Sequence, residues 1–566
     1  MEIKKNDIFD IVIEDMSENG EGIGKVNGYT LFVKDAVIGD RARVKVIKTK
    51  KTYGYGRLME VLSPSPDRQI PLCPAAAPCG GCQLQALSYP AQLAFKERKV
   101  RSQLKRLGGF ADPPVLPVIG MDHPYEYRNK AQFPIRRGKD GRIIAGFYAG
   151  RTHCVIETPR CYLGDPVNEE VLHLIIQWME RWKVEPYDEE RHEGLVRHVL
   201  IRTGERIQAG DDAAPRQLMV CLVINGAKLP HQQELVEALL TLPGMISISC
   251  NINREKTNVI LGTEVRCLYG EGYITDTIGP LRYRISPQSF FQVNREQTEK
   301  LYAAALDYAG LTGREKVWDL YCGTGTITLF LARQAGKVQG VEIVPAAIED
   351  ARANAAANGI TNAAFYVGRA EEILPRCYQE TGERADVIVV DPPRKGCGRE
   401  LLDTILAMEP DRVVYVSCEP STLARDLKIL CQDKYELVKV QPVDMFPQTV
   451  GCETVVLLSH KKADSYIHID VEFGEGEGKI PVDKIVQRAE KYKPKERVTY
   501  KRIKEYVLEK YGFKVHTAYI AEVKRSLGLP MYDAPNAVEE LKQPRKHPTP
   551  EKIEAIKDAL HYFAVI

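Results

Sequence analysis

The strongest constraint on the fold is an alternation of short apolar runs and helical patterns between residues 313 and 460. The apolar runs are rich in valine and isoleucine, as expected for strands buried on both faces of a sheet. Strands that alternate with helices form βαβ units, so this segment predicts a doubly wound parallel sheet. The expected strands are 316–320, 338–341, 387–390, 413–416 and 454–459, and the expected helices are 326–334, 345–358, 401–408 and 423–431.

The first strand of this sheet leads into a glycine-rich turn, 319–325, with the sequence Asp-Leu-Tyr-Cys-Gly-Thr-Gly. Glycines allow a tight turn and let the backbone approach a ligand closely. A dinucleotide fingerprint needs a third glycine at position 328, where this chain has threonine. The next strand ends in Glu342, where a carboxylate can hold the hydroxyls of a ribose. The combination favours S-adenosylmethionine over a nicotinamide cofactor.

Three further polar side chains follow later strands of the sheet. Asp391 opens the segment 391–396, Asp-Pro-Pro-Arg-Lys-Gly, which the two prolines stiffen. Cys418 follows the strand 413–416, so its thiol is expected at the carboxyl edge, where open α/β sheets bind ligands. Glu453 directly precedes the last strand. On pattern alone, a small buried cysteine and an ordinary loop acid remain alternatives for Cys418 and Glu453.

A methyl donor beside a cysteine points to carbon chemistry on a pyrimidine. Oxygen and nitrogen acceptors carry a lone pair and need no covalent enzyme intermediate. Pyrimidine C5 becomes nucleophilic when a thiolate adds to C6, and a base must afterwards remove the C5 proton. We therefore expect Cys418 as the nucleophile and Glu453 as the base, acting on a nucleobase turned out of its stack.

Residues 1–62 alternate apolar and polar residues in short runs separated by glycines, which predicts a small β-barrel. The stretch 41–57 holds seven basic residues, no acidic ones, and Tyr53 and Tyr55. Such a strip can follow a phosphate backbone and stack bases, so we expect contact with RNA. A solvated edge strand that uses lysine against aggregation is the alternative.

Cysteines at three positions mark a turn-rich segment that is typical of a metal or cluster loop. Cys73, Cys79 and Cys82 are separated by five and then two residues. Three thiolates need a fourth ligand to complete a tetrahedral zinc site or a 4Fe-4S cluster. Cys161 is the favoured fourth ligand and Cys154 the less favoured one. A cluster is preferred, and zinc remains the alternative.

Charge and hydropathy bound the partners of the chain. The helix expected over 93–107 carries six basic residues and predicts a positively charged wall beside the cysteine loop. The formal net charge is only +2, so contacts with RNA must come from local patches. No signal-peptide stretch and no apolar run of about 18 residues is found. We expect a cytoplasmic monomer without membrane contact, and scattered single cysteines fit a reducing compartment.

Two stretches outside these motifs are less specific. The segment 290–294, Phe-Phe-Gln-Val-Asn, precedes a helix expected over 295–309, and it predicts a pocket edge or, equally, a core strand. Beyond residue 460, helical patterns follow at 481–491, 499–511 and 517–527. We expect either a small helical, winged-helix-like module that adds RNA affinity or a structural appendage.

The motifs at 319–325, 391–396, 417–422 and 453–456 together resemble the RNA (uracil-5-)-methyltransferase family. The amino-terminal barrel resembles an OB-like TRAM domain, and the cysteine loop resembles the 4Fe-4S site of the 23S rRNA branch. The resemblance covers residues 1 to about 460. Family members commonly carry histidine and a small apolar residue before the base, whereas this chain has Gly451 and Cys452. The resemblance implies Cys418 and Glu453 as nucleophile and base, Gln292, Tyr321, Glu342 and Asp391 for S-adenosylmethionine, and Cys73, Cys79, Cys82 and Cys161 for the cluster.

The sequence thus predicts a multidomain α/β protein that methylates C5 of a uridine in 23S rRNA. The same chemistry on tRNA is an alternative, which the cysteine loop argues against, and an RNA-binding protein without turnover is another. The expected parts are a TRAM-like barrel (1–62), the cluster loop and basic helix (63–111), a mixed α+β RNA-binding domain (112–310), a Rossmann-like methyltransferase domain (311–460) and a mainly helical extension (461–566).

Overall fold

The computed structural model describes residues 3–150, 152–158, 160–208, 210, 213–461, 500–527 and 547–562. The chain forms two compact units, 1–465 and 466–566. Within the described residues, no helix has the length and apolarity needed to cross a membrane.

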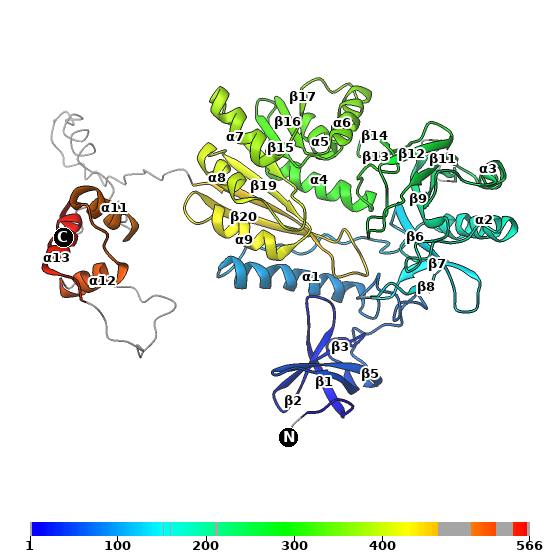
Figure 1. Cartoon of the computed structure of the whole chain (residues 1–566), viewed down its shortest axis with the longest axis horizontal. Helices are drawn as coiled ribbons and strands as arrows, with labels where there is room; N and C mark the ends of the chain where they lie inside the picture. Colours follow the sequence, from blue (N-terminus) through cyan, green and yellow to red (C-terminus); the bar gives the residue numbers. More distant parts are fainter. Residues whose placement is uncertain are drawn as a thin grey trace, which may run out of the picture. The chain divides into compact units, whose positions relative to one another are not determined.

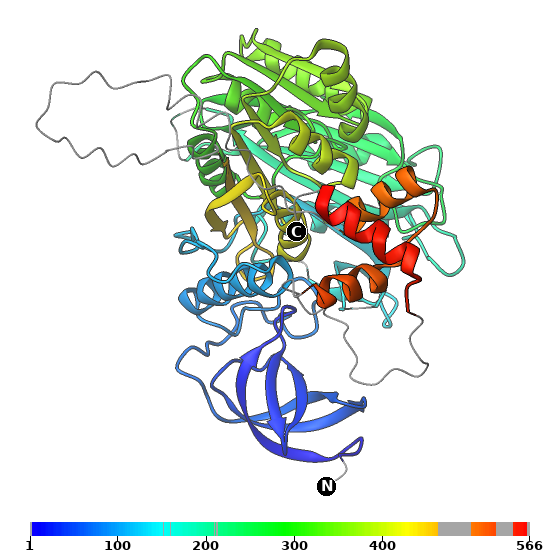
Figure 2. The same cartoon turned by 90° about the vertical axis from the view of Figure 1, so that its left-hand side faces the viewer.

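The amino-terminal strands close into a small barrel in the order β1-β2-β3-β5-β4, as the sequence predicts (Figure 2). Alternate residues such as Ile11, Leu31 and Val44 fill its interior. Gly56 is required at one close approach, because a Cβ atom there would lie 2.2 Å from Cγ1 of Val44. The strands are β1 (Ile8–Met16), β2 (Gly22–Val26), β3 (Tyr29–Lys34), β4 (Arg41–Thr49) and β5 (Tyr53–Ser63).

A long helix, α1 (Tyr89–Gln103), follows the cysteine loop and continues as a π-helical turn over Leu104–Gly108. It begins earlier than expected because Pro90 occupies its first turn, where a missing N–H costs nothing. The predicted charged wall is wrong for Lys96, which is fully buried and paired with Asp444. Arg101 is also used internally, since its guanidinium donates to the carbonyl oxygen of Val115 at 2.8 Å.

The central part of the chain forms a seven-stranded mixed sheet in the order β12-β11-β10-β9-β6-β7-β8. Helices α2 (Val167–Trp182) and α3 (Gln232–Leu239) pack on one of its faces, and a short hairpin follows it (Figure 1). The strands are β6 (Lys130–Arg137), β7 (Ile143–Tyr148), β8 (Val155–Glu157), β9 (Val196–Arg206), β10 (Arg216–Ile224), β11 (Met245–Ile252) and β12 (Glu264–Tyr269), and the hairpin is β13 (Ile274–Ile278) and β14 (Leu281–Ile285).

A second seven-stranded sheet has the order β17-β16-β15-β18-β19-β21-β20. The five strands from β17 to β19 are parallel, β21 runs antiparallel to β19, and β20 pairs antiparallel with β21 and so runs in the direction of the five. This confirms the doubly wound sheet. Its strands are β15 (Lys316–Leu320), β16 (Lys337–Glu342), β17 (Ala363–Val367), β18 (Val387–Val390), β19 (Arg412–Ser417), β20 (Tyr435–Val443) and β21 (Glu453–His460).

Helices cover both faces of this sheet, which explains why a central strand such as β18 is apolar and buried at every position. One face packs against α4 (Arg295–Ala309), α5 (Thr326–Ala332) and α6 (Pro345–Ala357), and the other packs against α1, α7 (Ala370–Thr381), α8 (Arg399–Met408) and α9 (Pro420–Leu430). Three elements escaped the sequence analysis. Strand β17 is short and β20 is largely polar at its start, while α7 contains an internal proline, Pro375.

The second unit contains α11 (Tyr500–Tyr511), α12 (Thr517–Ser526) and α13 (Pro550–Tyr562). Ile503, Val507, Ile520 and Ile556 form part of its own apolar core. The helices expected over 499–511 and 517–527 are confirmed, and α13 was not expected. The pattern at 481–491 lies outside the described residues.

Candidate active site

The strand order reverses between β15 and β18. From β15 the chain adds β16 and β17 on one side, and then returns to place β18 and β19 on the other. Ligands of open α/β sheets bind at such a switch point, beside the carboxyl ends of the strands. The glycine turn after β15 and Asp391 after β18 therefore lie where a ligand is expected.

The glycine turn has a strained backbone that only a few residue types tolerate. Tyr321 has φ 67° and Gly323 has φ 55°. The N–H of Gly323 donates to the carboxylate of Glu342 at 3.2 Å, and the N–H of Val344 donates to the same carboxylate at 3.0 Å. A Cβ atom on Gly323 would meet no atom within 4 Å. The turn is thus fixed by Glu342 and leaves room for a ligand above Gly323.

Two carboxylates beneath this turn fit a cationic ligand. Asp319 is fully buried, and burial together with the charges of Asp391 and Glu342 raises its pKa to about 7. Its Oδ2 accepts from Oγ1 of Thr328 at 2.5 Å, while its Oδ1 is buried without a hydrogen-bond partner. Burial also raises the pKa of Asp391 to about 7. A sulfonium or ammonium group would relieve the cost of these poorly compensated carboxylates.

The segment 290–292 lies against the same turn, because Oγ1 of Thr324 donates to the carbonyl oxygen of Phe290 at 3.4 Å. Phe290 is 68% exposed, whereas Gln292 is 9% exposed. The segment is not a strand, so the pocket-edge interpretation is favoured over the core-strand one. On the other side of the turn, the Tyr321 hydroxyl donates to Glu371 at 2.8 Å. Glu371 was missed because it belongs to α7, which the sequence analysis did not find.

Cys418 and Glu453 are brought together by the register of two strands. The antiparallel strands β19 and β21 pair Ser417 with Thr454. Cys418 follows Ser417 and Glu453 precedes Thr454, so this register places Cys418 and Glu453 opposite each other. Cys418 is partly exposed, and Glu453 is 5% exposed. The sequence places these side chains 35 positions apart, and the sheet makes them neighbours.

The charges around this pair are mostly negative. Burial, followed by the Glu453 and Asp391 carboxylates, raises the pKa of the Cys418 thiol to about 11. Burial and Asp391 raise the pKa of Glu453 to about 8. Arg394 opposes both shifts and lowers the pKa of each group. The sequence pattern assigns no role to Arg394, because its proximity to both groups depends on the tertiary structure.

A buried hydrogen-bond network holds the loop that carries Arg394. The N–H of Cys397 and the hydroxyl of Tyr415 both donate to Oδ2 of Asp426, at 2.8 and 2.7 Å. Oγ1 of Thr422 donates to the carbonyl oxygen of Arg394 at 3.0 Å. The segment 391–397 is therefore attached to α9, the helix that begins directly after Cys418.

The four cysteines named from the sequence converge. Cys73 and Cys79 are buried, and Cys82 and Cys161 are partly buried. Burial and the neighbouring Cys161, Cys79 and Cys73 raise the pKa of Cys82 to about 12. Cys154 is exposed. In the described parts of the chain, no group of three or more His, Cys, Asp or Glu side chains is arranged so that it could hold a metal ion.

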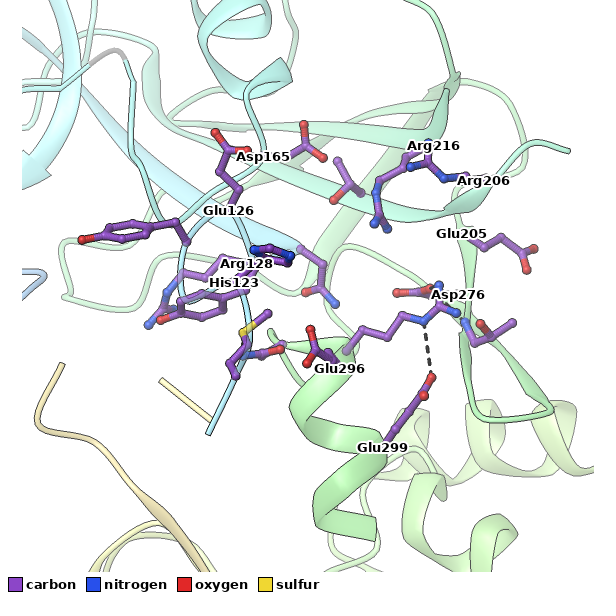
Figure 3. A pocket seen from close by; sticks show the side chains of 18 of the residues that line it. His123, Glu126, Arg128, Asp165, Glu205, Arg206, Arg216, Asp276, Glu296 and Glu299 are labelled. Atoms are coloured by element: carbon purple, nitrogen blue, oxygen red, sulfur yellow. Dashed lines mark hydrogen bonds and ion pairs between the residues drawn. The ribbon is translucent and has the colours of Figure 1, made fainter. Parts of the chain in front are cut away.

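A large cavity lies beside, but apart from, the Cys418 edge. Its volume is about 820 Å³, and it is bordered by the segment 121–129, the ends of β9 and β10, the β13 hairpin and the start of α4. Figure 3 shows acidic and basic side chains facing one another across it, with Arg295 3.5 Å from Glu299. Asn129 connects the two regions, since its Nδ2 donates to the carbonyl oxygen of Gln292 at 3.0 Å.

A doubly wound sheet with a glycine turn after its first strand, and with the acids Glu342 and Asp391 after the neighbouring strands, is typical of a class I S-adenosylmethionine-dependent methyltransferase. Comparisons with known proteins narrow this class. A family model described as tRNA (Uracil-5-)-methyltransferase matches residues 273–461, and a TRAM domain model matches residues 4–59.

An uncharacterized RNA methyltransferase of Halalkalibacterium halodurans is 48% identical over 460 residues, which cover 81% of this chain and 98% of that protein. A second, from Clostridium tetani, is 47% identical over 459 residues, covering 81% and 97%. The crystal structure of Pyrococcus abyssi tRNA (uracil-54, C5)-methyltransferase in complex with S-adenosyl-L-homocysteine has 26% identity and a TM-score of 0.63, and it covers 80% of this chain and 100% of that chain. The chain belongs to the RNA (uracil-5-)-methyltransferase family.

Proposed function

We propose that the enzyme transfers a methyl group from S-adenosylmethionine to C5 of a uridine in 23S rRNA. The observation that carries the chemistry is the pair formed by Cys418 and Glu453 at the carboxyl edge of the sheet. The pair faces a site whose carboxylates suit a sulfonium. The observation that favours ribosomal RNA is the convergence of four cysteines, as in the branch that the sequence resembles.

Cys418 acts as the nucleophile. Its thiolate forms a bond to C6 of the uracil ring, and the electron pair of the C5–C6 double bond moves toward C5 and the O4 carbonyl. Burial and two carboxylates disfavour the thiolate. Arg394 is the cation that opposes them and lowers the pKa of the thiol. S-adenosylmethionine, when bound, supplies an electrophilic methyl group and a second positive charge.

Glu453 completes the reaction. After C5 has taken the methyl group, the Glu453 carboxylate removes the C5 proton, the C5–C6 double bond re-forms, and the C6–sulfur bond breaks to return the Cys418 thiolate. A carboxyl with a pKa near 8 is a stronger base than a solvated one, which suits this step. The methylated base and one proton are released.

We assign the cofactor contacts to Gln292, Tyr321, Glu342 and Asp391. Glu342 ends β16 and holds its carboxylate beside the glycine turn, which suits the ribose hydroxyls. Asp391 lies toward the methyl-bearing end, since its charge acts on both Cys418 and Glu453. Gln292 belongs to the segment 290–292, which contacts the turn through Phe290, and Tyr321 lies within the turn itself.

We further assign Cys73, Cys79, Cys82 and Cys161 to a 4Fe-4S cluster. Burial and the neighbouring cysteines raise the pKa of these thiols, because several thiolates close together repel one another. A bound metal group supplies the positive charge that would stabilise them as thiolates. Zinc bound by the same four thiolates is the alternative.

Transfer RNA is the second candidate substrate. The matching family model and the P. abyssi protein are both named for tRNA uracil-5 methylation. The amino-terminal barrel suits either RNA. Its Tyr53 and Tyr55 rings lie 5.9 Å apart beside Phe32, on the strip that is rich in basic residues.

The experiment that tests the function measures tritium release from C5-tritiated uridine in unmodified 23S rRNA and, in parallel, in bulk tRNA. Release from ribosomal RNA alone supports the proposal. Release from tRNA alone assigns the enzyme to the second substrate. No release from either RNA, with protein of full iron content, would contradict methylation of C5.

A further inference from the structure

The loop that leads to Glu453 takes its shape from a distant part of the chain. Strands β20 and β21 are joined by the nine-residue segment 444–452, here called the base loop. Few hydrogen bonds connect residues within the base loop, and these involve Phe446, Thr449 and Gly451. Its other hydrogen bonds reach the start of α4, the segment 83–99 and the segment 119–127.

Gln448 is the centre of this attachment. It is 1% exposed and has φ 69°, a conformation that residues other than glycine adopt only when their surroundings require it. Its carbonyl oxygen accepts from the N–H groups of Gln83 and Leu84, at 3.2 and 3.0 Å. These two residues directly follow Cys82.

The side chain of Gln92 in α1 completes the attachment. The N–H of Gln448 donates to Oε1 of Gln92 at 3.0 Å, and Nε2 of Gln92 donates to Oε1 of Gln448 at 2.9 Å. Nε2 of Gln448 in turn donates to the carbonyl oxygen of Pro124 at 3.4 Å. All four polar groups of Gln448 therefore bond to residues that precede residue 125 in the chain, and Gln92 is fully buried.

Other side chains of α1 also bond to the base loop. Lys96 donates to the carbonyl oxygen of Phe446 and Lys99 to that of Val450, both at 3.0 Å. Tyr89 donates to Asp444 at 3.0 Å, and Lys96 forms a fully buried ion pair with the same carboxylate. Gly451 is needed here because a Cβ atom would lie 3.0 Å from the Phe446 ring.

We propose that Gln448, held by Gln92, is a positioning residue for Glu453, and that the segment after Cys82 thereby sets the base that removes the C5 proton. A base acts only within hydrogen-bond reach of its proton, so a small shift of the base loop slows this step selectively. A displacement of the cysteine loop would then also displace the base loop, because the two are hydrogen-bonded through Gln448. The proposal rests on Glu453 being the base.

The first test is hydrogen exchange of residues 444–455 in the full-length protein. Gln92→Leu removes the partners of the N–H and Oε1 of Gln448 and should speed exchange there about tenfold or more. Gln103→Leu is the matched control, because Gln103 is a buried glutamine on the same helix that contacts Glu18 and not the base loop. Cys82→Ser should also speed exchange of the base loop. Equal protection in the Gln92 and Gln103 variants would overturn the proposal.

The second test separates positioning from general damage. Gln92→Leu should accumulate a covalent RNA–protein adduct that already carries the methyl group, because only proton removal is slowed. A merely structural defect would instead reduce adduct formation and S-adenosylmethionine binding together. The RNA is whichever of 23S rRNA and tRNA releases tritium. Gln448→Gly, which suits the positive φ and keeps the backbone bonds, replaces Gln92→Leu if that variant does not fold, and should show a smaller accumulation.

Glu453→Gln separates the role of Glu453 as the base from the positioning role of Gln448. If Glu453→Gln itself accumulates no methylated adduct, the assignment of the base is wrong and the proposed mechanism fails with it. If Glu453→Gln accumulates the adduct while Gln92→Leu turns over as Gln103→Leu does, the mechanism stands and the positioning role of Gln448 is wrong.

Discussion

The carboxyl edge of the doubly wound sheet and the cysteine loop hold their functional groups by different means. At the edge, Asp391, Cys418 and Glu453 each stand at the end of a strand, so the ladder of the sheet fixes their spacing. The cysteines at 73, 79, 82 and 161 stand in turns without a common element, and several of them raise the pKa values of the others. A site on strand ends exists before its ligand binds, whereas a site on turns depends on what it binds.

The largest expected effect is the loss of activity when the nucleophile at the carboxyl edge of the sheet is removed. Cys418→Ala removes the nucleophile and should lower tritium release by about 10⁴-fold or more, while RNA binding is retained. Cys431→Ala, a partly buried cysteine at the end of α9, should release tritium at the normal rate. Measurable turnover by the Cys418 variant would contradict covalent catalysis.

The next effect tests the dependence of the cysteine loop on its ligand. Cys82→Ser should lose most of its iron and sulfide and lower the melting temperature by about 5–10 °C, because metal binding contributes directly to the stability of such loops. Cys154→Ser should keep its iron, since Cys154 is exposed. Zinc at full occupancy without sulfide, measured by elemental analysis, would replace the cluster with the alternative metal.

A smaller effect concerns the charge that balances the catalytic edge. The thiolate of Cys418 and the carboxylate of Glu453 are the active forms, with pKa values of about 11 and about 8, so kcat/KM should rise with pH through this range. Arg394→Gln removes a cation that lowers both values and should move the profile to higher pH, costing about tenfold at neutral pH. Lys395→Gln is the matched control. A profile that falls above pH 7 in the native enzyme would contradict these assignments.

The smallest effect concerns the second unit, which has its own core and lies outside the two regions compared. Deleting residues 465–566 should weaken RNA binding only a few-fold and flatten its salt dependence, if the unit contributes a few phosphate contacts. Filter binding at several salt concentrations measures both. Unchanged affinity at every concentration would assign the unit a structural role instead.

Part of the site was predictable because it follows strand ends. The pattern of valine-rich runs located Cys418 and Glu453 to within a residue of their strands, and the glycine turn located Glu342. Lys96 shows the limit of the same method. Its side chain is basic and its helix was found, but the buried partner Asp444 lies 348 residues away, so a charged surface was expected where an ion pair is buried.

The sequence by itself predicted most strands and helices of the doubly wound sheet, and it supplied the candidate nucleophile, base and cysteine ligands. These depend on local period, residue type and short spacing. The tertiary structure decided that Arg394 faces Cys418 and Glu453, and that Gln92 and Gln448 join α1 to the base loop. Such contacts connect residues far apart in the chain, where burial and hydrogen-bond geometry, and not sequence period, select the partner.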